Sequence, residues 1–132
     1  MWTPEFRPDF TVAESGIAAF VAFDKDVDFI GKAAALRERQ TGVEKKLVTL
    51  IVDSEDVDCV YDEAVFHIGK CVGYVTSGEY AHYCQQSMAM AYLPTALAIV
   101  GEQFEVEILG ELKAAFVQAK ALHDPTGSRM KV

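Results

Sequence analysis

The sequence predicts a mainly β protein, a small antiparallel barrel of about six strands that follows an N-terminal arm and one or two short helices. The hydrophobic pattern changes from helical to strand-like at Lys45. Two dipeptides, Gly69-Lys70 and Gly110-Glu111, each lie between apolar runs and indicate tight hairpins. Short antiparallel strands expose unpaired edges unless the sheet closes, so a barrel is the expected packing.

The N-terminal third is predicted to be separate from the barrel, with an arm and helix over residues 1–42 and the barrel over residues 43–132. Residues 1–9 contain two prolines and little periodicity, which indicates an extended arm. A short helix is expected within residues 11–20. The apolar residues 20–23 are expected to form a short strand.

Residues 28–42 give the clearest helix prediction. Asp28 is expected to cap the first turn, because its carboxylate can accept hydrogen bonds from unpaired backbone N–H groups. Residues 33–39 are strong helix formers, and Gly42 provides the end of the helix. The exposed face is strongly charged, so we expect this helix to lie on a surface.

The strands are predicted from β-branched runs and from alternation of apolar and polar residues. They are expected at residues 47–52, 64–68, 71–76, 87–93, 103–109 and 112–119. The first run is continuously apolar, which favours a strand covered on both sides. A glycine at the first of two loop positions is typical of a type II′ turn, which we expect in both hairpins. One helical turn is expected within residues 94–101.

Composition excludes several classes of function. The chain has 20 acidic and 12 basic residues, for a net charge of −8. Such a charge repels nucleic-acid backbones and anionic membrane surfaces, so neither is an expected partner. The three cysteines form no disulfide framework, and no apolar run reaches the about 18 residues of a membrane span. Because no secretory signal opens the sequence, we expect a reducing, cytoplasmic location.

Motifs along nearly the whole chain resemble the aminomethyltransferase family, which includes the T-protein of the glycine cleavage system. They are Asp28-Phe29-Ile30-Gly31 before the helix, residues 73–78 followed by Tyr80 and His82, the strand 87–92, and the tail Asp124-Pro125 with Arg129-Met130-Lys131. Residues 8–16 and the tail are most similar to the folate-binding part of dimethylglycine and sarcosine dehydrogenases. The resemblance implies that this chain is the C-terminal barrel of such a protein.

The chain also departs from the family's usual residues. Glu79 and Ala81 stand where the family has Gly, Gln86 where it has Lys, His123 where it has Tyr, and residues 62–64 where it has Gly-Glu-Pro. The larger departure is that the upstream folate-binding domains, which carry the family's functional carboxylate, have no counterpart here. The resemblance therefore implies no catalytic residue in this chain.

The function that the resemblance implies is a part in one-carbon transfer to tetrahydrofolate. The barrel would close one side of the folate channel and position the cofactor. Arg129 is the main candidate ligand, because a guanidinium can pair with the carboxylates at the glutamate end of a folate. Tyr80 and His82 are further candidates, and catalysis is expected to need an upstream domain.

Two alternatives remain at this point. The chain could be a non-catalytic interaction module that docks to a separate folate-domain or flavoprotein subunit, or to a second copy of itself. Trp2, Phe6 and Phe10 favour this alternative, because an extended arm would otherwise expose their apolar surface. The chain could also be a small-ligand barrel unrelated to folate.

Other reactive residues have simpler interpretations. Residues 76–78 are expected to form a turn at the end of a strand, where a glycine could let backbone approach a ligand. His67 is expected to be half-buried and structural, and Cys71 to be buried and inert. The spacing of histidines and cysteines fits no zinc site, and the acidic loop 53–58 lacks the order of a calcium loop. We therefore expect no metal.

Overall fold

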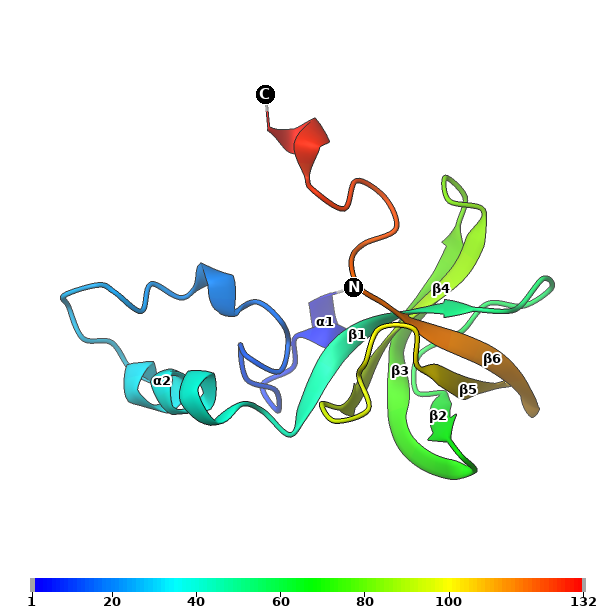
Figure 1. Ribbon diagram of the computed structural model, residues 1–132, viewed down its shortest axis with the longest axis horizontal. Helices are drawn as coiled ribbons and strands as arrows, with labels where there is room; N and C mark the ends of the chain where they lie inside the picture. The colour runs from blue at the N-terminus through cyan, green and yellow to red at the C-terminus, as the bar shows by residue number, and fades with distance from the viewer. Residues whose placement is uncertain (1, 132) are drawn as a thin grey trace.

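A closed antiparallel barrel forms the main body of the computed structural model, which describes residues 2–131 (Figure 1). Its strands are β1 (Lys45–Val52), β2 (Ala64–His67), β3 (Lys70–Ala81), β4 (Gln86–Pro94), β5 (Gln103–Ile108) and β6 (Glu111–Gln118). Around the barrel they follow the order β1-β4-β3-β2-β5-β6, and β6 pairs again with β1. The predicted fold class is confirmed.

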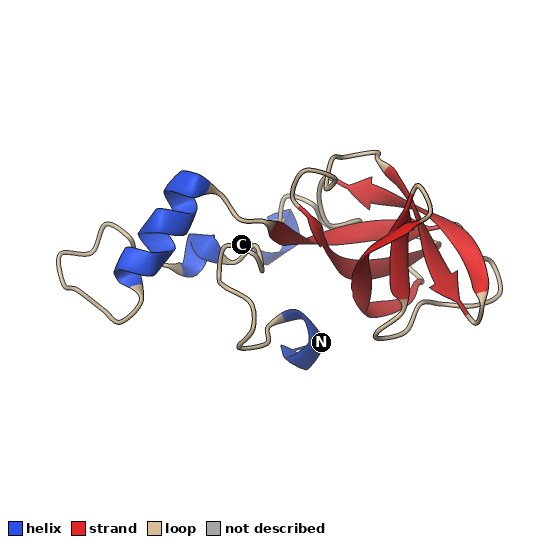
Figure 2. Cartoon of the chain, turned by 90° about the horizontal axis from the view of Figure 1, so that it is seen from below, coloured by secondary structure: helices blue, strands red, loops and turns tan. Residues whose placement is uncertain are grey.

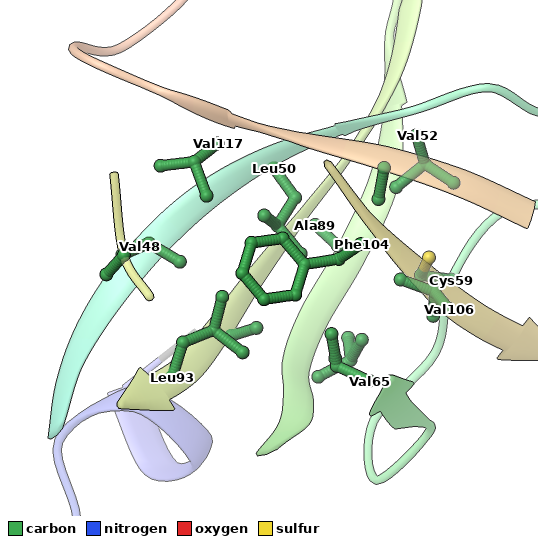
Figure 3. Packing of buried hydrophobic residues seen from close by; sticks show 14 of the residues in the cluster. Val48, Leu50, Val52, Cys59, Val65, Ala89, Leu93, Phe104, Val106 and Val117 are labelled. Carbon is green, nitrogen blue, oxygen red and sulfur yellow. The ribbon is translucent and has the colours of Figure 1, made fainter. Parts of the chain in front are cut away.

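The core fills the inside of the barrel with alternate residues of each strand. Along β5, Phe104, Val106 and Ile108 are buried, as the alternation predicted. Figure 3 shows the Phe104 ring among inward-pointing aliphatic side chains, Leu50 and Leu93 included. Burying each of these large side chains contributes about 1.5–3 kcal/mol.

Strand β1 is covered on one side only, so the prediction of two covered faces was wrong. Val48, Leu50 and Val52 point into the core, whereas the residues between them are half-buried on the outer surface. The wall of a barrel has one inner and one outer face, and a β-branched run on such a wall can be apolar on both. Continuous apolarity therefore did not indicate a second layer.

Both predicted hairpins exist, but the predicted turn type was wrong. The loop residues are Ile68-Gly69 and Leu109-Gly110, so each glycine occupies the second loop position. All four residues have positive φ, at 50° and 70° in the first turn and 50° and 84° in the second. Positive φ at both positions is typical of type I′, whose twist matches that of the flanking strands.

Residues 76–78 form no turn, contrary to prediction. They continue β3 through an irregularity in its pairing with β4 between Val75 and Ser77. The buried Thr76 hydroxyl donates a hydrogen bond to the carbonyl of Met90 at 3.1 Å. Gly78 is required by packing, because a Cβ atom there would lie 2.4 Å from the carbonyl oxygen of Cys59.

The N-terminal segment differs from the prediction in three places. A single helical turn, α1 (Trp2–Glu5), replaces the extended arm. Successive turns and a 3₁₀ helix at Ala18–Phe20 replace the helix expected within residues 11–20. Residues 20–23 form no strand, since the closed barrel offers no free edge with which they could pair.

Helix α2 (Lys32–Thr41) begins later than predicted. Its N-cap is Gly31, with φ of 90° and no side-chain cap, while Asp28 accepts a hydrogen bond from Phe29 N–H instead. Gly42 ends the helix, as predicted, and its N–H donates to the carbonyl of Glu38 at 2.8 Å. No residue of α2 is buried, and Figure 2 shows the helix projecting away from the barrel.

The arm packs on the outside of the barrel around Tyr92. The Phe10 ring stacks on the Tyr92 ring with centroids 3.8 Å apart, and the Tyr92 hydroxyl donates to the carbonyl of Glu5 at 2.7 Å. Ser15 Oγ lies 2.9 Å from the same hydroxyl, and burial raises the pKa of Tyr92. The Phe10 ring therefore packs against the barrel, whereas the side chain of Trp2 lies outside the described part of the chain. The boundary at residue 42 stays a prediction.

Between β4 and β5, Ala98 N–H donates to the carbonyl of Pro94 at 3.1 Å. This i to i+4 hydrogen bond closes a single turn, and no regular helix follows it.

Candidate functional site: a hairpin tip and the C-terminal tail

The tip of the β3–β4 hairpin carries two of the three predicted ligand residues. Strand β1 ends at Val52, opposite Ser87 of β4, so residues 81–86 continue beyond it (Figure 1). The Tyr80 and His82 rings meet edge to face, with centroids 5.0 Å apart and an interplanar angle of 78°. His82 is exposed, whereas Tyr80 is half-buried and lines a hollow of about 530 Å³.

The C-terminal tail lies back against this hairpin and brings Arg129 to it. The Arg129 guanidinium donates a hydrogen bond to the Tyr83 hydroxyl at 3.3 Å and lies over the Tyr83 ring at 5.6 Å. The His123 ring meets the same ring edge to face at 4.4 Å. Tyr83 follows His82 directly in the sequence, so the tail and the two predicted hairpin residues lie on one tip.

Tyr83 is the residue that the sequence interpretation missed. It is 73% exposed, yet it contacts both His123 and Arg129. A large aromatic residue at the tip of a hairpin was the available signal, because an exposed aromatic side chain indicates a contact.

Asp124 gives the tail its local shape. Its carboxylate accepts hydrogen bonds from the backbone N–H groups of Ser128 and Arg129 at 2.9 and 3.0 Å, and from the Ser128 hydroxyl at 2.9 Å. The bond from Arg129 N–H is the largest cause that lowers the pKa of Asp124, and the Ser128 bonds add to it. The carboxylate is therefore engaged with backbone, which leaves the Arg129 guanidinium without a carboxylate partner among residues 2–131.

The predicted half-burial of His67 is confirmed, and its structural role stays a prediction. His67 is half-buried, with Nε2 2.9 Å from Glu102 Oε1 and its ring 5.1 Å from that of Phe104. Its contacts lie at the barrel wall and not at the hairpin tip, so they indicate a structural role.

The three free thiols have different surroundings. Cys59 is 1% exposed, and burial, followed by the nearby Glu63 and Asp58, raises its pKa to about 12. Such a thiol is protonated and unreactive at neutral pH. Cys71 is exposed, contrary to prediction, because it lies just after the β2–β3 turn, where the strand extends past the core.

Polar contacts to neighbouring strands hold the acidic loop, and they include Asp53 N–H donating to the carbonyl of Ala114 at 2.8 Å. The Ser87 hydroxyl donates to Asp58 at 2.7 Å, and Lys113 Nζ lies 3.9 Å from Asp56. Within residues 2–131, no three His, Cys, Asp or Glu side chains gather as metal ligands do. The same part of the chain contains no helix long and apolar enough to cross a membrane.

Comparison with known proteins assigns the family. A model of the glycine cleavage T-protein C-terminal barrel domain matches residues 45–124. Human mitochondrial dimethylglycine dehydrogenase is 38% identical over 132 residues, which cover 98% of this chain and 15% of that protein. An aminomethyltransferase of Synechocystis is 34% identical over 111 residues, covering 84% of this chain and 30% of that protein.

A solved structure supports the fold. Glycine cleavage system aminomethyltransferase T from Bartonella henselae matches with a TM-score of 0.77 at 24% identity, covering 89% of this chain and 33% of that one. The barrel and these matches define a C-terminal barrel domain. The chain belongs to the aminomethyltransferase family, in which its relatives are dimethylglycine dehydrogenases and glycine cleavage T-proteins, and it spans a third or less of the relatives described above.

Proposed function

We propose that this chain is the C-terminal part of a tetrahydrofolate-linked one-carbon transfer protein of the aminomethyltransferase or dimethylglycine and sarcosine dehydrogenase type, and that it positions folate. The observation that supports this is the contact of Arg129 with Tyr83, which brings the tail to the hairpin tip that also carries Tyr80 and His82. Membership of the family supports the cofactor class.

Arg129 and the rings at the tip suit the carboxylates and the flat ring system of a folate. The Arg129 guanidinium donates a weak 3.3 Å bond to the exposed Tyr83 hydroxyl and lies over its ring, so it can exchange the hydroxyl for a carboxylate at little cost. The exposed His82 ring and the half-buried Tyr80 offer flat faces and polar edges on the same hairpin. When bound, tetrahydrofolate supplies the acceptor for the one-carbon unit.

We assign no catalytic residue to this chain. The proposed role of the barrel is to close one side of the folate channel and to hold the glutamate end through Arg129. The acid–base chemistry is expected in an upstream folate domain, on the same chain or on another. A cytoplasmic location also stays a prediction, and the human relative is named as a mitochondrial protein.

An NMR titration with tetrahydrofolate tests this proposal. We expect the signals of Tyr80, His82 and Arg129 to shift, and Arg129→Gln to remove most of that response. Arg39→Gln is the matched control, because the Arg39 guanidinium also lies over an aromatic ring, that of Phe23 at 5.0 Å, on the N-terminal segment. If no signal at the hairpin tip moves at saturating ligand, the proposed site is wrong.

A second function, docking to a separate folate-domain or flavoprotein subunit, is supported by the segment 16–44. A helix of ten residues is marginal in water unless it packs on something, and no residue of α2 is buried. The chain that leads to it exposes Phe20 at 90%, Val27 at 63% and Ile30 at 105%. These side chains suit an apolar surface of a partner.

Light scattering, together with purification from the native host, tests the docking function. We expect the chain to co-purify with a folate-domain or flavoprotein subunit, and Ile30→Glu to release that subunit. Self-association that is lost in the same variant would assign the surface to a homo-oligomer. A monomer whose α2 amides exchange as slowly as those of the barrel would contradict docking, since the helix would then be stable unaided.

A further inference from the structure

We propose that the outer face of β6, β1 and β4 is a docking surface for a protein segment that combines apolar anchors with lysine or arginine. This outer face consists of Phe116, Ile51, Met88 and Met90, with Leu112 at its border. The pairing register joins the first three directly, since Ile51 lies opposite Phe116 on one side and opposite Met88 on the other. Neighbouring side chains on one face of a sheet contact each other, so the row is continuous.

The outer face is separate from the part of the barrel that the arm covers. The arm packs at the other end of β1 and β4, where Leu47 N–H donates to the carbonyl of Glu14 and Tyr92 stacks on Phe10. Ile51 lies four residues along β1 from Leu47, a distance of about 13 Å. The segment 16–44 leaves the barrel at the same far end, so neither covers Ile51.

Two hollows border the row of Phe116, Ile51 and Met88, and each could accept an apolar side chain of the partner segment. One is the hollow of about 530 Å³ that Tyr80 also lines, and Ile51, Phe116 and the acidic Asp53 and Glu55 contribute to its wall. The other, of about 260 Å³, is lined by Met88 and Met90. Methionine side chains adapt to the shape of an apolar group, which suits a surface that must accept a partner's side chain. Leu112, 54% exposed, extends the apolar area along β6.

The charge of the residues that line the two hollows indicates the chemistry of the partner segment. The charged residues that line the two hollows are Asp53, Glu55 and Glu79, and no lysine or arginine lines either one. A cationic side chain could pair with these carboxylates while it lies against the Phe116 ring. A second copy of this chain is disfavoured, because each copy carries a net charge of −8. A basic, apolar-anchored segment of another protein is the complementary partner.

Two synthetic amphipathic peptides of equal length, one of leucine and arginine and one of leucine and glutamate, test the proposal by NMR titration at physiological salt. We expect the arginine peptide to shift the signals of Ile51, Met88 and Phe116, and the glutamate peptide to shift none of them. Asp53→Lys with Glu55→Lys should weaken binding of the arginine peptide at least about tenfold.

The matched control is Asp24→Lys with Asp26→Lys, which changes net charge equally on exposed residues of the N-terminal segment. The affinity of this control variant for the arginine peptide should change less than about twofold. Equal losses in the two double variants would mean non-specific attraction to an acidic protein and would overturn the proposal. Equal binding of the glutamate peptide would overturn it too. Met88→Gln keeps size and charge, so it tests the apolar contribution if the charge variants fail to fold.

Discussion

Two glycines of β3 are fixed by close contact with neighbouring segments of the chain. A Cβ atom on Gly73 would lie 2.1 Å from the carbonyl oxygen of Tyr92, and the clash at Gly78 is with backbone of Cys59. Because backbone must move to admit a methyl group, we expect Gly73→Ala to lower the free energy of unfolding by about 2–3 kcal/mol. Gly110→Ala meets nothing within 4 Å but has φ of 84°, so it should cost about 1 kcal/mol. Urea unfolding measures both, and equal costs would contradict the close contact.

The cysteines should differ sharply in reactivity. We expect Cys71 to react first with a thiol reagent at neutral pH, and Cys59 to react only on unfolding, because it is buried and its pKa is raised to about 12. A raised pKa means that the buried neutral thiol stabilises the fold below its ordinary pKa of 9.0, and that this contribution is lost as the pH rises from 9.0 towards 12. Rapid modification of Cys59 in the folded protein would contradict its burial.

At the scale of elements, the C-terminal tail should respond to acid. A carboxyl group whose pKa is lowered on folding stabilises the folded form above its unfolded pKa, and that stabilisation disappears as the pH falls through the folded value. For Asp124, the hydrogen bonds to Ser128 and Arg129 should hold near neutral pH and be lost below pH 3.8. Amide exchange of Arg129 measures this. Asp124→Ala should expose the amide at every pH, and unchanged protection would show that the tail is held elsewhere.

The packing of the arm on the barrel should depend on the Tyr92 hydroxyl. Tyr92→Phe removes the hydrogen bond to the carbonyl of Glu5 and the contact with Ser15, so we expect a loss of about 1–2 kcal/mol. The arm should also become easier to cleave, while the barrel spectrum stays unchanged. Tyr83→Phe is the control, because its exposed hydroxyl should contribute less than about 0.5 kcal/mol. Limited proteolysis measures how easily the arm is cleaved. An arm that resists cleavage in Tyr92→Phe would contradict the role of the Tyr92 hydroxyl in holding the arm on the barrel.

Strands were easier to predict than helices because their signal repeats. The alternation of Phe104, Val106 and Ile108 follows directly from one buried face. The start of α2 was misplaced because Asp28 has the chemistry of a cap but lies three residues before Gly31, which takes the cap position by its conformation. Turn type depends on the sign of φ at Ile68 and Leu109, residues that carry no such signal.

At the scale of the whole molecule, closure of the barrel could be predicted because open antiparallel edges are unfavourable. The contact of the tail with the hairpin tip could not be predicted in full. Arg129 was a candidate by its chemistry, but its partner Tyr83 is 46 residues away in sequence, and no periodic pattern joins the two. The outer face of β6, β1 and β4 could not be predicted from the sequence either, because it depends on the register of three strands.

The barrel itself carries many of the residues by which the chain resembles its family. Several residues that identify the family build the barrel: Gly73 and Gly78 admit neighbouring backbone, and the strand 87–92 supplies wall and core. The chain spans 15% of one relative and 30% of another, so the activity of the longer relatives stays a proposal for it.

A calorimetric titration of the chain with tetrahydrofolate decides whether the barrel positions folate. We predict weak binding, near a dissociation constant of about 1 mM, because an exposed guanidinium and two rings supply only about 4 kcal/mol. The heat should disappear in Arg129→Gln and persist in Arg39→Gln. Absence of both heat and thermal shift with millimolar tetrahydrofolate would contradict a folate-positioning role for this chain.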